Sequence, residues 1–258
     1  MKMHFYKYQG TGNDFIIIDA LKSDVALNPA QIKKLCDRRF GIGADGLMVI
    51  KSRLGYDFEM LYYNSDGYEG TMCGNGARCI LRYASNKKLI DKNADFMVGG
   101  NVYHGRIDND LIHVIMNDVE VPSQKNGHSE IDTGSPHIVI PVSFLENYDV
   151  IKEGRRIRYD TAYKPDGINV NFIEEISENE INMRTYERGV EAETWSCGTG
   201  AIAGAVFQAT RHEISEGSID INMPGGTLKV SFTRSGDHFV NIRLSGPAVF
   251  VFEGEVVV

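Results

Sequence analysis

The chain has 258 residues, of which 42% are hydrophobic, and its formal net charge is −8 at pH 7. This length allows one large domain or two of ordinary size, with enough apolar side chains for a real core. The negative charge argues against a nucleic-acid-binding surface, and no apolar run approaches the ~18 residues needed to span a bilayer. Residues 1–5 lead directly into alternating strand residues. We therefore expect no signal peptide, a cytoplasmic protein, and thiols rather than a disulfide framework.

In the first half of the chain, the pattern predicts short strands and two helices. Asn28-Pro29 is an N-cap and N1 pair that opens a helix reaching about Arg38. A second helix begins after Cys73, where apolar residues recur at i, i+3, i+4 and i+7 from Ala77. Strands are expected at Phe5–Tyr8, Phe15–Asp19, Leu47–Ile50, Phe58–Tyr63, Phe96–Val98, Val102–Ile107 and Leu111–Met116.

In the second half, a polar segment and an apolar helix stand out. Pro122–Glu130 is rich in polar residues, and we interpret it as a loop that forms the boundary between two halves. The segment after Cys197 is apolar almost all round from Ala201 to Phe207. Such a segment predicts a buried helix, and a buried helix wrapped by strands is the expected core of each half.

A cysteine followed by Gly-x-Gly-Ala occurs twice, at Cys73 and Cys197, and its surroundings repeat with it. Each cysteine has a glutamate four residues before it, and a Gly-Gly pair follows the helix. A strand-like stretch with Met and Tyr three residues apart precedes each copy. These matching features are Glu69, Met60, Tyr63 and Gly99-Gly100 in the first copy, and Glu193, Met183, Tyr186 and Gly225-Gly226 in the second. Two equivalent halves with one thiol each predict two opposed thiols, as a two-base racemase or epimerase requires.

The glycines after each cysteine place backbone amides at a helix N-terminus. The amides and the helix dipole favour an anion there, which could be the thiolate or a substrate carboxylate. The Cα–H of an amino acid is a very weak acid, and its carbanion is stabilised when amides hold the adjacent carboxylate. Cysteine suits the base because its pKa lies near neutrality. This chemistry needs no pyridoxal, metal or nucleotide, so we expect no cofactor.

The remaining cysteines and a further glycine motif have simpler interpretations. Cys36 and Cys79 are interpreted as buried, hydrophobe-like residues in mid-helix, without a glycine turn or a matched partner. A structural zinc site would need closely spaced ligands, and the cysteines are too scattered. Residues 41–46 spell G-x-G-x-x-G, but a predicted helix precedes them and a strand follows. Since a dinucleotide fingerprint has the reverse order, we interpret them as a glycine turn near the site.

The chain resembles the diaminopimelate epimerase family over nearly its full length. The resemblance implies an α/β fold of the α+β type. It has two pseudo-symmetric domains, each a strongly curved mixed sheet around a central helix, and an active site in the cleft between them. It also implies a homodimer, with domains at 1–118 and 119–248 and a last strand, 249–258, that returns to the first. The matching motifs are residues 7–15, 39–46, 63–67, 72–78, 134–137, 169–172, 186–189 and 197–200.

The resemblance also implies roles for individual residues. Cys73 and Cys197 match the two catalytic bases, and His137 and Glu187 match groups that assist them. Without the resemblance, His137 would be read as a loop histidine and Glu187 as a surface ion-pair partner. Matches to substrate-binding positions are Asn13, Asn64, Asn169, Glu187 and Arg188, with Gly74, Asn75, Gly198 and Thr199 as backbone donors to the reacting carboxylate.

Two departures from the family pattern affect this assignment. Ser135 stands where the family usually has Asn, which puts one contact to the distal carboxylate of the substrate in question. One extra residue lies between Arg188 and Cys197, around 190–193, and leaves the place of Glu193 open.

The resemblance thus implies an enzyme that interconverts LL- and meso-diaminopimelate for lysine and peptidoglycan precursor synthesis. A relative acting on proline, hydroxyproline or histidine would keep both cysteines but not necessarily the distal set of Asn64, Asn169, Glu187 and Arg188. A non-catalytic binding module on the same fold could lose either thiol. A redox thiol protein would be expected to have low-pKa cysteines that are adjacent in sequence or geometry.

Overall fold

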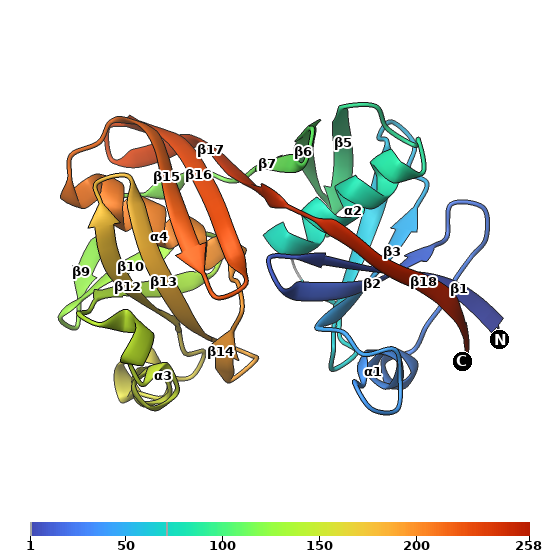
Figure 1. The fold of residues 1–258 in the computed structure, drawn as a ribbon, viewed down its shortest axis with the longest axis horizontal. Coiled ribbons are helices and arrows are strands. Elements are labelled where there is room, and N and C mark those ends of the chain that lie inside the picture. Colours follow the sequence, from blue (N-terminus) through green and yellow to red (C-terminus); the bar gives the residue numbers. More distant parts are fainter. Residues whose placement is uncertain (1, 71) are drawn as a thin grey trace. The chain divides into compact units, whose positions relative to one another are not determined.

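The structure is a computed structural model that describes residues 2–70 and 72–258 and divides the chain into two compact units (Figure 1). Unit 1 is Met1–Val114 with Gly246–Val258, and unit 2 is Ile115–Ser245. The predicted domain limits remain predictions. Thr71, which belongs to the first copy of the repeated motif, lies outside the described residues.

The described part of unit 1 contains two helices within a mixed sheet. Strands β2 and β3 are parallel, as are β4 and β5, while the other printed neighbours in the unit are antiparallel. The elements are β1 (Lys2–Gly10), β2 (Asn13–Asp19), α1 (Pro29–Cys36), β3 (Gly46–Lys51), β4 (Phe58–Asn64), α2 (Gly74–Asn86), β5 (Asn93–Val98), β6 (Asn101–Asp108), β7 (Leu111–Ile115) and β18 (Val249–Val257). The last strand, β18, pairs antiparallel with β1.

The two helices of unit 1 cover opposite faces of its sheet. Alternate residues of a strand point to opposite faces. On β2, Ile16 and Ile18 therefore pack with Ile32 and Leu35 of α1. The other face of the sheet meets α2, which contacts β1, β2, β3, β6 and β18. Phe15 is fully buried on this second face.

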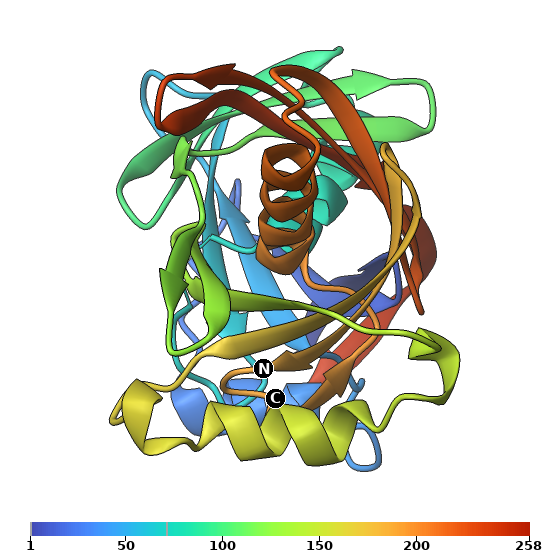
Figure 2. The same cartoon turned by 90° about the vertical axis from the view of Figure 1, so that its left-hand side faces the viewer.

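Unit 2 repeats this arrangement. Its elements are β8 (Val119–Glu120), β9 (Ser123–Lys125), β10 (His128–Asp132), β11 (Pro136–Pro141), η1 (Leu145–Asn147), α3 (Val150–Arg158), η2 (Thr161–Tyr163), β12 (Asn169–Ser177), β13 (Glu180–Glu187), β14 (Ala192–Thr194), α4 (Gly198–Arg211), β15 (Glu216–Met223), β16 (Gly226–Ser235) and β17 (His238–Pro247). Helix α3 packs on Ile138, Val170, Phe172 and Tyr186. Helix α4 contacts β10–β13, β15 and β16, and Figure 2 shows it enclosed by strands of its unit.

The strand registers define which residues of the two units are equivalent. Met60 pairs with Ile50 on β3, and Met183 pairs with Ile173 on β12. Tyr63 bridges Glu69, and Tyr186 pairs with Glu193. Counting along the paired strands from these anchors makes three sets of residues equivalent. They are Phe15 with His137, Met48 with Asn171, and Tyr62 with Thr185.

Most predicted elements are confirmed, and three details are wrong. Residues 122–130 are not a loop, because β9 and β10 pair there as a hairpin within unit 2. Strand β7 ends at Ile115 rather than Met116, and Cys36 is the last residue of α1 rather than a mid-helix residue. The helix at Pro29 has the predicted N-cap, Asn28, whose side chain accepts from Gln31 N. The helix after Cys197 is buried, as its composition predicts.

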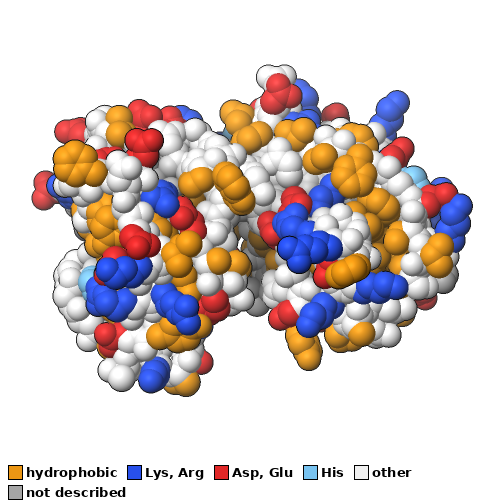
Figure 3. Space-filling model, turned by 60° about the horizontal axis from the view of Figure 1, so that its bottom comes forward, with side chains coloured by type: hydrophobic (Ala, Val, Ile, Leu, Met, Phe, Trp, Pro, Cys, Tyr) orange, Lys and Arg blue, Asp and Glu red, His pale blue; other side chains and the backbone are white. Residues whose placement is uncertain are grey.

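None of the helices in the described part of the chain is long and apolar enough to cross a membrane. On the face drawn in Figure 3, hydrophobic, basic and acidic side chains are interspersed.

Candidate active site

Cys73 is the N-cap of α2 and lies at the start of a glycine-rich first turn. Its extended backbone directs the side chain back over the helix, where Sγ accepts a hydrogen bond from Gly76 N at 3.4 Å. The amides of a first helical turn have no partner within the helix, so they favour an anion at this position. A thiolate at Cys73 is therefore stabilised by its own helix.

Asn13 brings a second side chain to this thiol. Its Oδ1 accepts from the Cys73 thiol at 3.9 Å and from Asn75 Nδ2 at 3.2 Å. The structure thus joins three of the predicted unit 1 site residues in one cluster. Asn75 is only 2% exposed, and its side chain forms hydrogen bonds with other residues of the protein.

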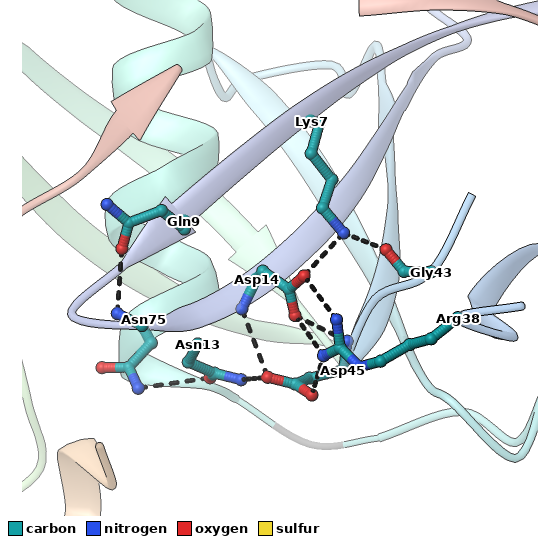
Figure 4. A network of polar contacts seen from close by, with 9 residues as sticks. Lys7, Gln9, Asn13, Asp14, Arg38, Gly43, Asp45 and Asn75 are labelled. Carbon is teal, nitrogen blue, oxygen red and sulfur yellow. Dashed lines mark hydrogen bonds and ion pairs between the residues drawn. The ribbon is translucent and has the colours of Figure 1, made fainter. Parts of the chain in front are cut away.

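A charged network holds Asn13 in place (Figure 4). Asp45 Oδ2 accepts from Asn13 Nδ2 at 2.7 Å, and Arg38 bonds to both Asp45 and Asp14 at 2.7 Å. Lys7 forms an ion pair with Asp14 at 2.7 Å. Burial alone would raise the pKa of Asp14, but the hydrogen bonds from Arg38 and Lys7 outweigh it and lower the pKa to about 2.

Arg78 lies fully buried at the start of α2. Its guanidinium donates to Asn75 Oδ1 at 2.9 Å, to Thr11 Oγ1 at 3.2 Å, and to the carbonyls of Gly74 and Pro247 at 3.3 Å. All four acceptors are uncharged, and burial lowers the pKa of Arg78 to about 10. The side chain therefore ties the helix to the β1–β2 turn and to the last part of the chain.

The predicted substrate-binding residue Asn64 lies apart from this cluster in the contacts described. It is the exposed last residue of β4, opposite Gly46, and its amide N donates to the carbonyl of Tyr68. The sequence prediction for Asn64 therefore rests on the resemblance.

Cys197 occupies the same position in unit 2 as Cys73 in unit 1. It is the N-cap of α4, and its Sγ accepts from Gly200 N at 3.4 Å. Thr199 Oγ1 lies 3.5 Å from the same sulfur. The residue is only 6% exposed. Equal distances at the two caps show that the repeated motif folds in the same way twice.

His137 lies in strand β11, fully buried, and not in a loop. Its neighbour Ile138 packs against α3, so alternation directs His137 to the opposite face, which α4 covers. Burial, with a smaller effect from the Arg188 charge, lowers the pKa of His137 to about 3. The imidazole is therefore neutral at physiological pH.

Three predicted binding residues meet at the ends of β11, β12 and β13. Asn169 donates to Ser135 Oγ at 2.9 Å and to the carbonyl of Pro136 at 3.0 Å. The amide N of Arg188 donates to Asn169 Oδ1 at 2.9 Å, and its guanidinium reaches Ser135 Oγ at 3.4 Å. Ser135 thus takes part in the cluster despite the departure from the family pattern. The guanidinium of Arg188 can bind a carboxylate in a bidentate manner.

Glu187 ends β13, and its Oε2 accepts from Thr194 Oγ1 at 2.8 Å. In the turn that follows, Glu191 adopts a left-handed backbone with φ of 58°. Glu193 is bound bidentately by Arg184, at 2.6 and 2.8 Å. The carboxylate of Glu193 therefore serves an ion pair of its own unit.

The two other cysteines are buried, as expected. Cys36 is 4% exposed, and burial raises its pKa to about 12. Cys79 is fully buried inside α2, and burial raises its pKa as well. Neither thiol is suited to act as a base at neutral pH.

Several residues of these clusters were given no role from the sequence. Asp45 lies within the glycine turn of residues 41–46, and the signal in the sequence was an acidic residue just before a predicted strand. Asn171 belongs to the motif of residues 169–172. The sequence feature that could have identified it is a polar residue at an inward-facing position of a strand. No group of three or more His, Cys, Asp or Glu within residues 2–70 and 72–258 could hold a metal ion.

Comparisons with known proteins point to one family. A family model described as diaminopimelate epimerase matches residues 5–117 and 130–251. A diaminopimelate epimerase from Flavobacterium psychrophilum is 47% identical over 253 residues, which cover 97% of this chain and 99% of the relative. One from Chlorobaculum tepidum is 37% identical, covering 96% and 98%.

Solved structures at low identity share the fold. A phenazine biosynthesis protein of the PhzF family from Bacillus anthracis has a TM-score of 0.75 at 16% identity, with both chains covered fully. A hydroxyproline epimerase from Agrobacterium vitis, with bound trans-4-hydroxy-L-proline, has a TM-score of 0.74 at 12% identity and covers 99% and 92% of the two chains. At these identities the similarity concerns the mixed α/β, two-domain fold.

Proposed function

The chain belongs to the diaminopimelate epimerase family, and on this premise we propose that it interconverts LL- and meso-2,6-diaminopimelate as a cofactor-independent isomerase. The observation that carries the proposal is the pair of cysteines. Each is the N-cap of a helix beginning Gly-x-Gly, and the two helices occupy equivalent places in the repeated units. The product would enter lysine and peptidoglycan precursor synthesis in the cytoplasm.

The proposed reaction moves one proton off Cα and another onto it. The thiolate of one cysteine accepts the Cα proton and becomes a thiol, and the C–H electron pair delocalises into the adjacent carboxylate. The thiol of the other cysteine then donates its proton to the opposite face of Cα and becomes a thiolate. Hydrogen-bond donors at the two helix N-termini, among them Gly74, Asn75, Gly198 and Thr199, would stabilise the carboxylate while it carries this charge.

We propose that the cluster around Arg188 binds the distal amino-acid group of the substrate. The guanidinium of Arg188 would bind the distal carboxylate, and Asn169 and Glu187 would bind the ammonium group. Ser135 supplies one hydroxyl in place of an amide, so its contact to the carboxylate would be a single hydrogen bond. A substrate with only one head group, such as proline, would leave this cluster without a partner, which disfavours it.

The decisive experiment follows deuterium at Cα during the first turnovers in D2O. With LL-diaminopimelate, we expect the meso product to carry deuterium while the remaining substrate still carries hydrogen, because the two protons pass through different thiols. Uptake from proline, hydroxyproline or histidine but not from diaminopimelate would assign the chain to another substrate. The absence of uptake from all of them would favour a binding module.

We also propose that the enzyme is a homodimer. Strand β18 exposes apolar side chains on both of its faces, including Val249 at 49%, Phe250 at 42%, Val251 at 50% and Phe252 at 44%. A row of exposed apolar residues on a strand is typical of an interface, and a second copy would cover it.

A further inference from the structure

A buried polar triad lies behind the start of α4 in unit 2. It consists of His137 on β11, Asn171 on β12 and Thr185 on β13, each fully buried. The three side chains are linked, with Asn171 Nδ2 at 3.1 Å from His137 Nδ1 and Thr185 Oγ1 at 2.9 Å from Asn171 Oδ1. No role for Asn171 or Thr185 was predicted from the sequence.

The fold itself does not need polar groups at two of these positions, those of His137 and Asn171. In unit 1 the equivalents of His137 and Asn171 are Phe15 and Met48, and both are fully buried. Met48 contacts the first turn of α2, with its sulfur 3.1 Å from the place a Cβ on Gly76 would occupy. Because buried polar groups cost free energy unless they are hydrogen-bonded, the triad in unit 2 indicates a function.

The hydrogen bonds fix the orientation of the Asn171 amide. Nδ2 donates to the carbonyl of Ile138 at 2.9 Å, and a carbonyl can only accept. If the amide were rotated by 180°, its oxygen would face that carbonyl, and the bond to Ile138 would be lost. With the amide in this orientation, the hydroxyl of Thr185 donates to Oδ1. Nδ2 is therefore the group that faces His137.

This orientation determines the tautomer of the imidazole. The amide nitrogen is only a donor, so Nδ1 of His137 must accept and carries no proton. The single ring proton of the neutral imidazole then lies on Nε2. Within residues 2–70 and 72–258, Nε2 has no hydrogen-bond partner although it is buried. Such a buried donor without a protein partner is available to another group.

Asn171 also lies next to the first turn that Cys197 caps. A Cβ on Gly200 would stand 2.7 Å from Asn171 Oδ1 and 3.3 Å from Cys197 Sγ. The side-chain amide of Asn171 and the thiol of Cys197 thus both lie close to Gly200 in the first turn of α4. A substitution of Asn171 would therefore change the contacts of both the imidazole and this turn.

We propose that Asn171 is a positioning residue that fixes His137 as the neutral Nε2–H tautomer, so that His137 offers a hydrogen-bond donor and not a second base in the half-site of Cys197. The catalytic consequence rests on the proposed function, whereas the tautomer does not. The donor would serve the anion formed at this helix N-terminus.

The tautomer is measured directly by NMR on protein labelled with 15N in its histidine rings. The His137 signals are those missing from His137→Gln, and 15N shifts separate protonated from unprotonated ring nitrogens. In the wild type near neutral pH, we expect protonated Nε2 and unprotonated Nδ1. A proton on Nδ1, or a charged ring, would overturn the proposal without any variant being needed.

Asn171→Asp tests the role of Asn171 with almost no change in shape. The carboxylate replaces the donor by an acceptor, so the proton should move to Nδ1, and kcat should fall at least about 10-fold with KM changed by less than about 3-fold. Asn147→Asp, an exposed site of unit 2, is the matched control for an added charge and should change neither. A switched tautomer with unchanged kcat would refute the positioning role.

Two further variants separate this effect from damage to the fold. Thr185→Val leaves the Asn171–Ile138 bond in place, so the tautomer and kcat should be nearly retained. If Asn171→Asp shows no thermal unfolding transition, Asn171→Met replaces it, since methionine fills the equivalent position in unit 1; both tautomers should then be populated. A wild-type protein with the expected tautomer that exchanges no Cα proton would refute the proposed function alone.

Discussion

At the scale of single residues, the two thiols have the same local geometry but different neighbours. Both sulfurs accept from a glycine amide at 3.4 Å in the first turn of a helix. Beside Cys73 lies the amide of Asn13, and beside Cys197 lies the hydroxyl of Thr199. This difference in neighbours suits a reaction in which each thiol acts on one face of an asymmetric carbon.

Replacing either of these thiols should abolish epimerisation. In Cys73→Ala or Cys197→Ala, one face of Cα lacks its acid or base. The value of kcat should therefore fall by about 10²–10⁴-fold or more. Cys36→Ala and Cys79→Ala are the matched controls and should keep nearly full kcat, measured on folded protein. If Cys73→Ala turned over at the wild-type rate, the two-thiol mechanism would be wrong.

Because His137 is buried in its neutral form, the free energy of unfolding should fall as the pH is lowered. Its folded pKa of about 3 lies below its unfolded value, so its contribution to stability is complete above about pH 6.5 and is lost as the pH falls towards 3. Between about pH 7 and pH 5 the wild type should lose about 1–2 kcal/mol more than His137→Gln. Urea unfolding of both proteins at each pH measures this difference. Equal losses would show that the buried ring is not neutral.

At the scale of secondary-structure elements, Asp14 connects β2 to β1 and to the segment after α1. It binds Lys7 and Arg38, and this network supports Asn13 through Asp45. Asp14→Asn should therefore destabilise the protein by about 2 kcal/mol at neutral pH, and this contribution should disappear in the wild type as the pH falls below about 4 towards 2.

The matched control for this prediction is Asp108→Asn. Asp108 also pairs with an arginine, Arg106, but on the exposed surface of unit 1. Exposed ion pairs contribute little, so the control should lose much less stability than Asp14→Asn in the same denaturation experiment. Equal losses in the two variants would contradict the structural role of Asp14.

The sequence predicted those elements whose cause is local. The N-cap of Asn28 and the apolar period after Cys73 each involve residues of only one or two helical turns, and both helices are confirmed. Residues 122–130 were misread because polar composition does not distinguish a surface hairpin from a loop. The pairing of Arg184 with Glu193 and the contact of Asn171 with His137 depend on strand register, which a single sequence does not determine.

At the scale of the whole molecule, the apolar strand β18 allows a test of the proposed dimer. Val251 is 50% exposed on this strand. Val251→Lys should shift the enzyme towards monomers in sedimentation equilibrium, because a charge at an apolar interface is costly to bury. Ile176→Lys is the control, since Ile176 is a comparably exposed strand residue of unit 2, at 54%. A wild-type protein that sediments as a monomer would exclude the homodimer.

The proposed reaction requires that both thiols reach one Cα, each from one face. If this requirement is met, their sulfurs can come together when no substrate separates them. A helix N-terminus also raises the thiolate fraction and with it the susceptibility to oxidation. Mild oxidants should therefore inactivate the enzyme, dithiothreitol should restore it, and diaminopimelate should protect it.

Peptide mapping of the oxidised protein identifies the bond. We expect a disulfide between Cys73 and Cys197, formed equally well in a Cys36→Ala, Cys79→Ala double variant and absent from Cys73→Ala. Cys79 is fully buried in the same helix as the Cys73 cap, so a bridge between these two would require that helix to open. If mapping found that bridge instead, the two thiols would not act on one carbon, and the two-base reaction would have to be abandoned.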